Sequence, residues 1–210
     1  MIIQVTSRRH RTWGCEAARS LLTALFVCAT LGFDTALAQD STRVQVWAAF
    51  SKMLEMSAEL DSIKQKAGGA APDISELRVR VLEFQRTVFT RQLKFAKDSI
   101  LKHKDRDLLA RLVAAVIAVK RFPDIPSRYE TFALGDIFLR EHELLVQVYR
   151  ELDLPDRRTV FPMLETGFMT STYRDSTSTD EYEKLKEMLL RLDPRHEQKE
   201  ESASPKSTKP

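Results

Sequence analysis

Residues 108–119 read Leu-Leu-Ala-Arg-Leu-Val-Ala-Ala-Val-Ile-Ala-Val, the most apolar run of the chain outside its N-terminus. Placed on a helix, this run is apolar on nearly every side, and such a helix is normally buried by other helices. It is shorter than the roughly 20 apolar residues that a membrane-spanning helix needs, and Arg111 interrupts it. The run therefore predicts the central helix of a helical bundle.

The composition favours the same fold class. The 210 residues suffice for one domain and include only 6 glycines and 8 prolines, whereas a sandwich or barrel needs many turn residues. We expect an all-α fold, an irregular bundle of about five to six helices packed around 108–119. The bundle occupies residues 39–193, and the charged segment 194–210 is predicted to be a disordered tail.

Residues 1–38 have the three parts of a secretory signal peptide. A basic segment ends at Arg19, an apolar run covers Leu21 to Leu31, and Ala36-Leu37-Ala38 fits the small residues of a cleavage site. The prediction is a cleaved signal peptide and a mature chain that is periplasmic or extracellular. A retained membrane anchor is the alternative, and the short apolar run argues against it.

Two other export signals fit the N-terminus less well. Arg8-Arg9 resembles a twin-arginine signal but lacks the apolar residues that should follow. Cys28 could be a lipid-modified cysteine, but Val27 before it is larger than the small residue that such a site prefers. Cys15 and Cys28 are the only cysteines, so the mature chain has none. That excludes disulfides, thiol nucleophiles and cysteine-based zinc sites from it.

The charge is nearly balanced once the signal peptide is removed. The full chain has 33 basic and 30 acidic residues, of which four arginines and two acidic residues fall within 1–38. The remainder has 29 basic and 28 acidic residues, a net charge of +1. The whole-chain charge is therefore no indication of nucleic-acid binding.

Apolar periodicity and capping residues divide the mature chain into helices. Ser127-x-x-Glu130 and Ser178-x-x-Glu181 are capping boxes, Asp73 is an N-cap, and a turn is expected near Lys104. The predicted helices cover 44–66, 74–102, 108–119, 127–152, 160–169 and 178–192, with 170–179 as a loop. The wide apolar arc of 74–102 predicts contact with two neighbouring helices.

Glu141 is the sharpest local anomaly, because it falls within the apolar stripe of the 127–152 helix, one turn from Ile137 and Leu145. A carboxylate held out of water is costly unless it is paired. We expect a structural ion pair with Arg111, since a short loop joins the two helices and makes them antiparallel neighbours. The alternative is an envelope hydrolase or ligand-binding enzyme that uses Glu141 and the adjacent His142 for acid–base chemistry.

The sequence contains none of the residue spacings typical of metal-binding, phosphate-binding or nucleophile motifs. The histidines of the mature chain stand in no metal-binding motif, and no phosphate-binding loop or nucleophile elbow occurs, so no metal or cofactor is predicted. A basic cluster is a candidate anion-binding surface, diluted by Asp98, Asp105 and Asp107. Its members are Arg91, Lys94, Lys97, Lys102, His103, Lys104 and Arg106.

Trp47, Phe50 and Met53 form an aromatic stripe that suits either the core or a docking face for a partner helix. Taken together, these features predict an exported, non-enzymatic helical protein that binds another envelope protein or an anionic polymer. Its oligomeric state is left open by the sequence.

Overall fold

The computed structural model describes residues 42–68, 71–122, 124–175 and 177–195, and every contact below lies within the unit formed by residues 43–210. The predicted signal peptide lies outside these residues, as does most of the predicted tail. Within the described ranges the secondary structure is helical, without strands. The all-α prediction is thereby confirmed for this part of the chain.

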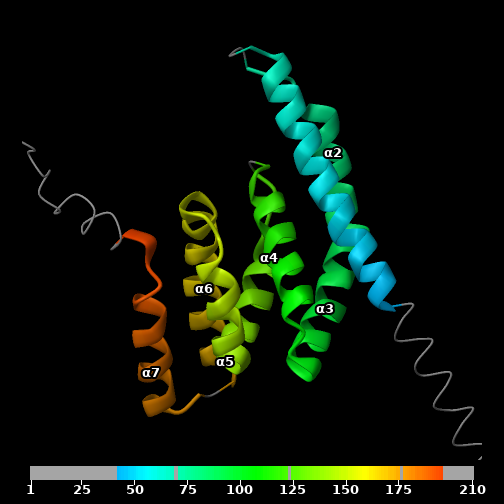
Figure 1. Ribbon diagram of the computed structural model, residues 1–210. Coiled ribbons are helices and arrows are strands. Elements are labelled where there is room, and N and C mark those ends of the chain that lie inside the picture. Colours follow the sequence, from blue (N-terminus) through cyan, green and yellow to red (C-terminus); the bar gives the residue numbers. More distant parts are fainter. Residues whose placement is uncertain (1–41, 69–70, 123, 176, 196–210) are drawn as a thin grey trace, which may run out of the picture. The chain divides into compact units, whose positions relative to one another are not determined.

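The helices follow the predicted order (Figure 1). Residues 42–66 form the first helix, and a π-helical segment, η1, interrupts the long second one. The remaining elements are α2 (Ser75–Phe84), η1 (Gln85–Phe89), α3 (Thr90–His103), α4 (Arg106–Lys120), α5 (Arg128–Arg150), α6 (Leu154–Asp175) and α7 (Thr179–Leu190).

The turn expected near Lys104 separates α3 from α4. Lys104 has a left-handed backbone conformation, with φ at 52°, which ends α3. The carboxylate of Asp105 then accepts a hydrogen bond from the Leu108 amide at 3.0 Å and caps α4. Residues 74–120 are therefore two helices and not one.

The segment α2–η1–α3 buries a narrower stripe of side chains than the wide arc that the sequence predicts, but its α3 part does contact two neighbouring helices, α4 and α5, as expected. Phe95, assigned to that arc, is 46% exposed, and Phe84 and Val88 are only partly buried. The buried residues are Leu77, Val81, Gln85, Phe89, Gln92, Leu93, Ala96 and Ile100. Figure 1 shows the segment antiparallel to the first helix, where Phe50 and Phe89 meet with ring centroids 5.6 Å apart.

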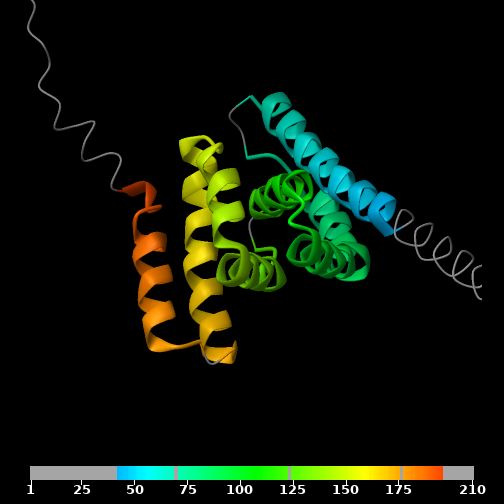
Figure 2. The ribbon, with the colours of Figure 1, turned by 60° about the horizontal axis from the view of Figure 1, so that its bottom comes forward.

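Helix α4, which contains the apolar run 108–119, is central to the packing. Eight of the fifteen residues of α4 are buried, and α4 contacts α3, α5 and α6 (Figure 2). Phe50 and Met53 of the first helix are fully buried in the same core, and Trp47 is partly buried and packs against it, so the aromatic stripe faces the core.

Helices α5 and α6 form the most extensive contact, and two glycines lie at their crossing. A β-carbon on Gly135 would lie 2.1 Å from the carbonyl carbon of Gly167, and one on Gly167 would lie 2.1 Å from the carbonyl oxygen of Thr131. Neither separation is sterically possible. The backbones therefore approach each other more closely than any other residue type would allow.

Helix α6 is longer than the sequence predicts, because it starts at Leu154 and continues through the predicted loop to Asp175. Pro162 lies in its interior and not in its first turn. Two hydroxyl groups of the Ser/Thr-rich end are satisfied within the helix, since Thr170 and Thr172 donate to the carbonyls of Thr166 and Phe168. The contact with α5 adds the packing that propensity alone does not supply.

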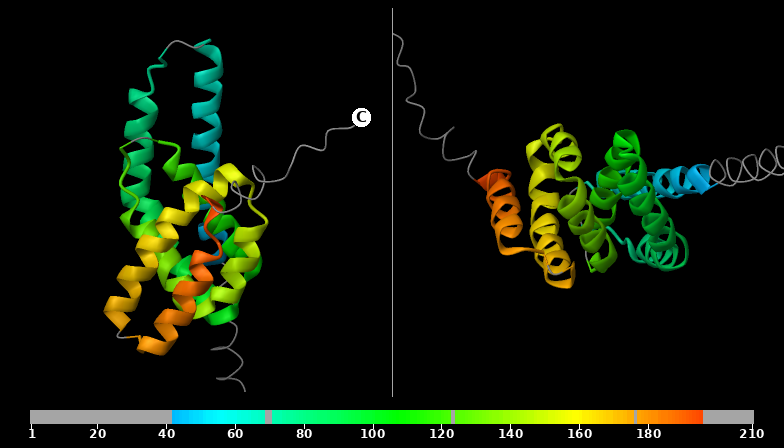
Figure 3. Two further views of the ribbon diagram at one scale, coloured as in Figure 1. Left: turned by 90° about the vertical axis from the view of Figure 1, so that its left-hand side faces the viewer. Right: turned by 90° about the horizontal axis from the view of Figure 1, so that it is seen from below.

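Helix α7 is capped as predicted, with the Ser178 hydroxyl accepting from the Glu181 amide. Tyr182 stacks on Phe168 of α6 with ring centroids 5.5 Å apart, and Figure 3 shows α7 beside α6. Beyond α7, Pro194 is buried, and it and Arg195 are helical, although both belong to the predicted tail. No helix in the described ranges has the length and apolarity that crossing a membrane requires.

Candidate functional site

The structure does not bring Arg111 and Glu141 together. The Arg111 guanidinium lies over the Trp47 ring, 3.7 Å from its centroid, so it faces the first helix instead of α5. The Glu141 carboxylate pairs with Lys104 at 3.1 Å. Helices α4 and α5 do touch, as expected, but the rotation of α4 about its axis turns Arg111 towards a different neighbour.

Glu141 lies at a break in α5, where its backbone angles, φ −135° and ψ 46°, are not helical. Its side chain is 17% exposed and reaches the largely exposed Lys104, so it is not a carboxylate enclosed in a core. The adjacent His142 is partly buried, and its Nδ1 has no hydrogen-bond partner among the described residues. Neither side chain lines the cavity around Lys120 or the cavity lined by Asp156.

The predicted anion-binding cluster is divided by ion pairs. Lys97 pairs with Asp136, Lys104 with Glu141 and Arg106 with Glu151. Arg91, Lys94 and Lys102 are exposed and form no ion pair with a described residue, and His103 is also exposed. Three of the seven members of the cluster are therefore already paired with carboxylates, and Arg91, Lys94 and Lys102 are the lysines and arginines left on the surface of α3.

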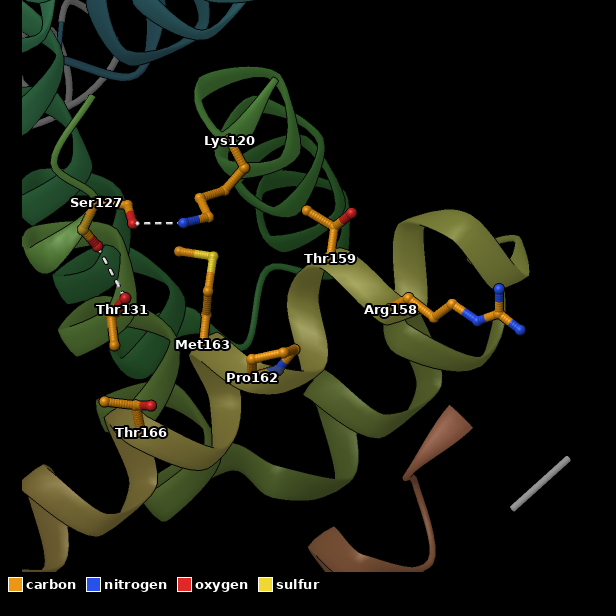
Figure 4. Close-up of a pocket in the computed structure, with 8 residues that line it drawn as sticks. All are labelled: Lys120, Ser127, Thr131, Arg158, Thr159, Pro162, Met163 and Thr166. Carbon is orange, nitrogen blue, oxygen red and sulfur yellow. Dashed lines mark hydrogen bonds between the residues drawn. The ribbon is translucent and has the colours of Figure 1, made fainter. Parts of the chain in front are cut away.

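A cavity of about 510 Å³ lies where the end of α4, the start of α5 and the middle of α6 meet (Figure 4). Lys120 extends into it and donates to the Ser127 hydroxyl at 3.2 Å. Figure 4 shows the Met163 side chain reaching into the same space, while the Arg158 guanidinium points away from Lys120. The lining residues, none of them acidic, are Lys120, Ser127, Thr131, Arg158, Thr159, Pro162, Met163 and Thr166.

The start of α5 differs from the capping box that the sequence predicts. The helix begins after Ser127, as expected, but the Ser127 side chain caps no backbone amide. Its hydroxyl instead accepts from Lys120. The amides of the first turn of α5 thus lack a side-chain cap beside the Lys120 cavity, which favours a negatively charged group there.

Glu130, the other member of the expected box, is fully buried and turned towards the π-helical segment. Its Oε1 accepts from Gln85 Nε2 at 2.8 Å, and Oε2 has no partner among the described residues. Burial raises the pKa of Glu130, opposed by the Gln85 hydrogen bond and by the charge of Lys120. Gln85 also donates to the Pro126 carbonyl at 2.6 Å, so it joins η1 to the loop before α5.

Asp136 is the second buried carboxylate of α5, and it is well paired. It accepts from Lys97 at 2.9 Å, from Ser171 at 2.6 Å and from Arg174 at 2.5 Å. Burial raises its pKa, but the hydrogen bonds from Ser171, Lys97 and Arg174 together outweigh burial and hold the pKa below its ordinary value. The network ties α3, α5 and α6 together, and it is structural in character.

The described side chains contain no group of three or more His, Cys, Asp or Glu placed to hold a metal ion. Sequence reasoning missed the Lys120 cavity, because its residues come from three helices and share no motif. The one available signal was Lys120 at the end of α4, followed by a proline-containing loop and then by Ser127.

Comparison of the chain with protein-family models, with curated proteins and with solved structures gave no match.

Proposed function

We propose that this chain is an exported, non-enzymatic helical protein that binds an anionic partner in the cell envelope, and that the Lys120 cavity holds an anionic group of that partner. The observation that carries the proposal is the lining of the cavity, where the Lys120 ammonium meets the Ser127 and Thr166 hydroxyls without a carboxylate. The Thr131 and Thr159 hydroxyls of the lining donate to backbone carbonyls. Hydroxyls and cations are the groups that bind phosphate and carboxylate oxygens.

Lys120 is not held in an ion pair with a described residue, although its charge acts on the buried Glu130 carboxyl at longer range. The Lys120 ammonium donates to the neutral Ser127 hydroxyl. The uncapped first turn of α5 adds the positive end of a helix dipole beside it. A phosphate or carboxylate group would compensate both, whereas a cation would be repelled by both.

The test is the affinity of the mature chain for fluorescently labelled polyphosphate and polyglutamate, measured by anisotropy. Lys120→Ala should weaken binding about fivefold or more, the equivalent of about 1 kcal/mol. Lys184→Ala is the matched control, because Lys184 is an exposed lysine on α7 away from the cavity. Affinity should also fall with added salt.

A competing surface is tested in the same assay. The double variant Lys94→Ala/Lys102→Ala removes two exposed cations of α3 that form no ion pair with a described residue. If it loses more affinity than Lys120→Ala, the anion binds at α3 and the cavity assignment is wrong. Equal losses in Lys120→Ala and Lys184→Ala would reduce the interaction to nonspecific charge attraction.

A further inference from the structure

A second cavity, of about 530 Å³, lies between the first helix, α4 and the junction of α5 with α6. Six lining residues are apolar: Leu54, Ala114, Ile117, Ala118, Leu152 and Pro155. Four are polar: Ser57, Arg121, Asp156 and Thr159. A volume of roughly 300–1,000 Å³ with mostly apolar walls and a few polar groups is characteristic of small-molecule sites.

Most of the polar groups in this cavity already have partners within the protein. Arg121 donates to the Ser57 hydroxyl at 3.2 Å, and its guanidinium is paired with Asp61. The Thr159 hydroxyl donates to the Pro155 carbonyl at 3.1 Å. The positive charge of Arg121 is therefore balanced mainly by Asp61 of the first helix, and it acts on the Asp156 carboxylate only at longer range.

Asp156 is the exception. Its carboxylate is partly buried and makes neither a hydrogen bond nor an ion pair with any described residue. Burial raises the pKa of Asp156, the neighbouring carboxylate of Asp153 raises it further, and Arg121 opposes the shift. The carboxylate has no hydrogen-bond donor among the described residues, and the apolar walls provide a surface for the rest of a ligand.

We propose that this cavity binds a small organic cation, an ammonium group carried on an apolar body. The ammonium N–H groups donate to the Asp156 carboxylate, and the apolar body packs against Leu54, Ile117 and Leu152. An anion would be repelled by Asp156. A neutral analogue would fill the walls without forming the ion pair. The site is separate from the Lys120 cavity, although Thr159 lines both.

The test uses 4-phenylbutylamine with the matched alcohol and the matched carboxylate, each titrated into the mature chain by calorimetry. The amine should bind at least tenfold more tightly than the alcohol, and the carboxylate should bind more weakly than either. Asp156→Asn keeps the side-chain shape and should lower amine affinity at least tenfold. Asp180→Asn is the matched control, because Asp180 lies in the first turn of α7 as Asp156 does in α6.

The pH profile gives an independent readout. Affinity for the amine should fall on acidification as Asp156 becomes protonated, and Asp156→Asn should abolish that dependence. Ala114→Leu, which places a larger side chain in the wall, should weaken the amine and the alcohol alike. Circular dichroism establishes that each variant is folded before titration.

Two results would overturn the proposal. One is equal affinity for the amine and the alcohol, and the other is an Asp156→Asn variant that binds the amine as the native chain does. In the second case the only role of Asp156 is a favourable interaction with the positive end of the α6 dipole. The variant should then show a slightly lower melting temperature with binding unchanged.

Discussion

Glu130 and Asp136 lie on the same helix and are both buried, yet their surroundings act on them in opposite directions. Asp136 receives three hydrogen bonds, two of them from cations, and its pKa is lowered. Glu130 receives one from a neutral amide, and its pKa is raised by burial. Partner number and charge, and not burial alone, decide which form of a buried carboxyl the fold favours.

Neutralising the two residues should therefore change stability in opposite directions at pH 7. Asp136→Asn should lower the free energy of unfolding by about 2 kcal/mol, because Lys97 and Arg174 lose their shared anion. Glu130→Gln should raise it by about 1 kcal/mol, because no charge is then held in the core. Urea unfolding measures both, and each variant is the control for the other.

The pH dependence separates the two further. The stabilisation from Asp136 is present above its unfolded pKa of about 3.9 and is lost as pH falls through its lower folded pKa. For Glu130 the stabilisation is complete below its unfolded pKa of about 4.3 and is lost as pH rises through its higher folded pKa. A Glu130→Gln variant no more stable at pH 7 than at pH 4, relative to the native chain, would contradict this assignment.

At the scale of the elements, the crossing of α5 and α6 depends on the absence of two β-carbons. Gly135→Ala and Gly167→Ala should each destabilise the protein by about 3 kcal/mol or more, because the helices have to separate. That outcome opposes helix propensity, which favours alanine over glycine by about 1 kcal/mol. Thermal unfolding of both variants measures the effect.

Ala58→Gly calibrates the propensity contribution, since Ala58 is an exposed position of the first helix. If Gly135→Ala stabilises the protein by about as much as Ala58→Gly destabilises it, the two backbones do not approach each other as closely as described.

Local signals predicted several helix ends, but not the side-chain contacts of Ser127 or the bounds of α6. Ser178 and the turn at Lys104 were predictable, because a cap or a left-handed residue acts on its own segment. Helix α6 was predicted too short, because Pro162 and the Ser/Thr residues lower local helix propensity while Gly167 supplies a contact that is visible only with α5 present.

The candidate sites depended on the same nonlocal information. Arg111 was correctly identified as the unusual residue of α4, but its partner is Trp47, some sixty positions earlier in the chain. The rotation of each helix about its axis decides such pairings, and apolar periodicity alone leaves that rotation uncertain by tens of degrees. The cavities lined by Lys120 and Asp156 combine residues from several helices, so no sequence spacing predicts them.

At the scale of the whole molecule, the described part of the chain is held by its core and by individual polar contacts, because its residues include no cysteine. Tyr149 makes one such contact across a long sequence separation. The Tyr149 hydroxyl donates to the Leu192 carbonyl at 3.0 Å, and the Arg157 carbonyl lies 3.3 Å from the same hydroxyl. This hydroxyl therefore links α5 to the segment that follows α7.

Tyr149→Phe should lower the free energy of unfolding by about 1 kcal/mol, the cost of leaving the Leu192 carbonyl without its donor. Hydrogen exchange should locate the effect, with faster exchange in 179–195 and little change in α4. Tyr173→Phe is the control, because Tyr173 is 92% exposed. Faster exchange throughout the bundle would show that the contact belongs to the global core instead.

The π-helical segment changes the direction, around the helix axis, in which the buried side chains of its helix point. The buried positions Leu77, Val81, Gln85, Phe89 and Leu93 lie four residues apart, with Gln92 also buried beside the last of them, and in a regular α-helix each four-residue step advances about 40° around the axis. Over four steps the stripe would wind roughly 160° away from the first helix. The wider turn at Gln85–Phe89 holds one residue more than an α-helical turn. The extra residue rotates the following buried positions by about 100° back towards the first helix. The π-helical segment therefore keeps the buried stripe facing the first helix, although the four-residue spacing of that stripe is longer than the roughly 3.6 residues of an α-helical turn.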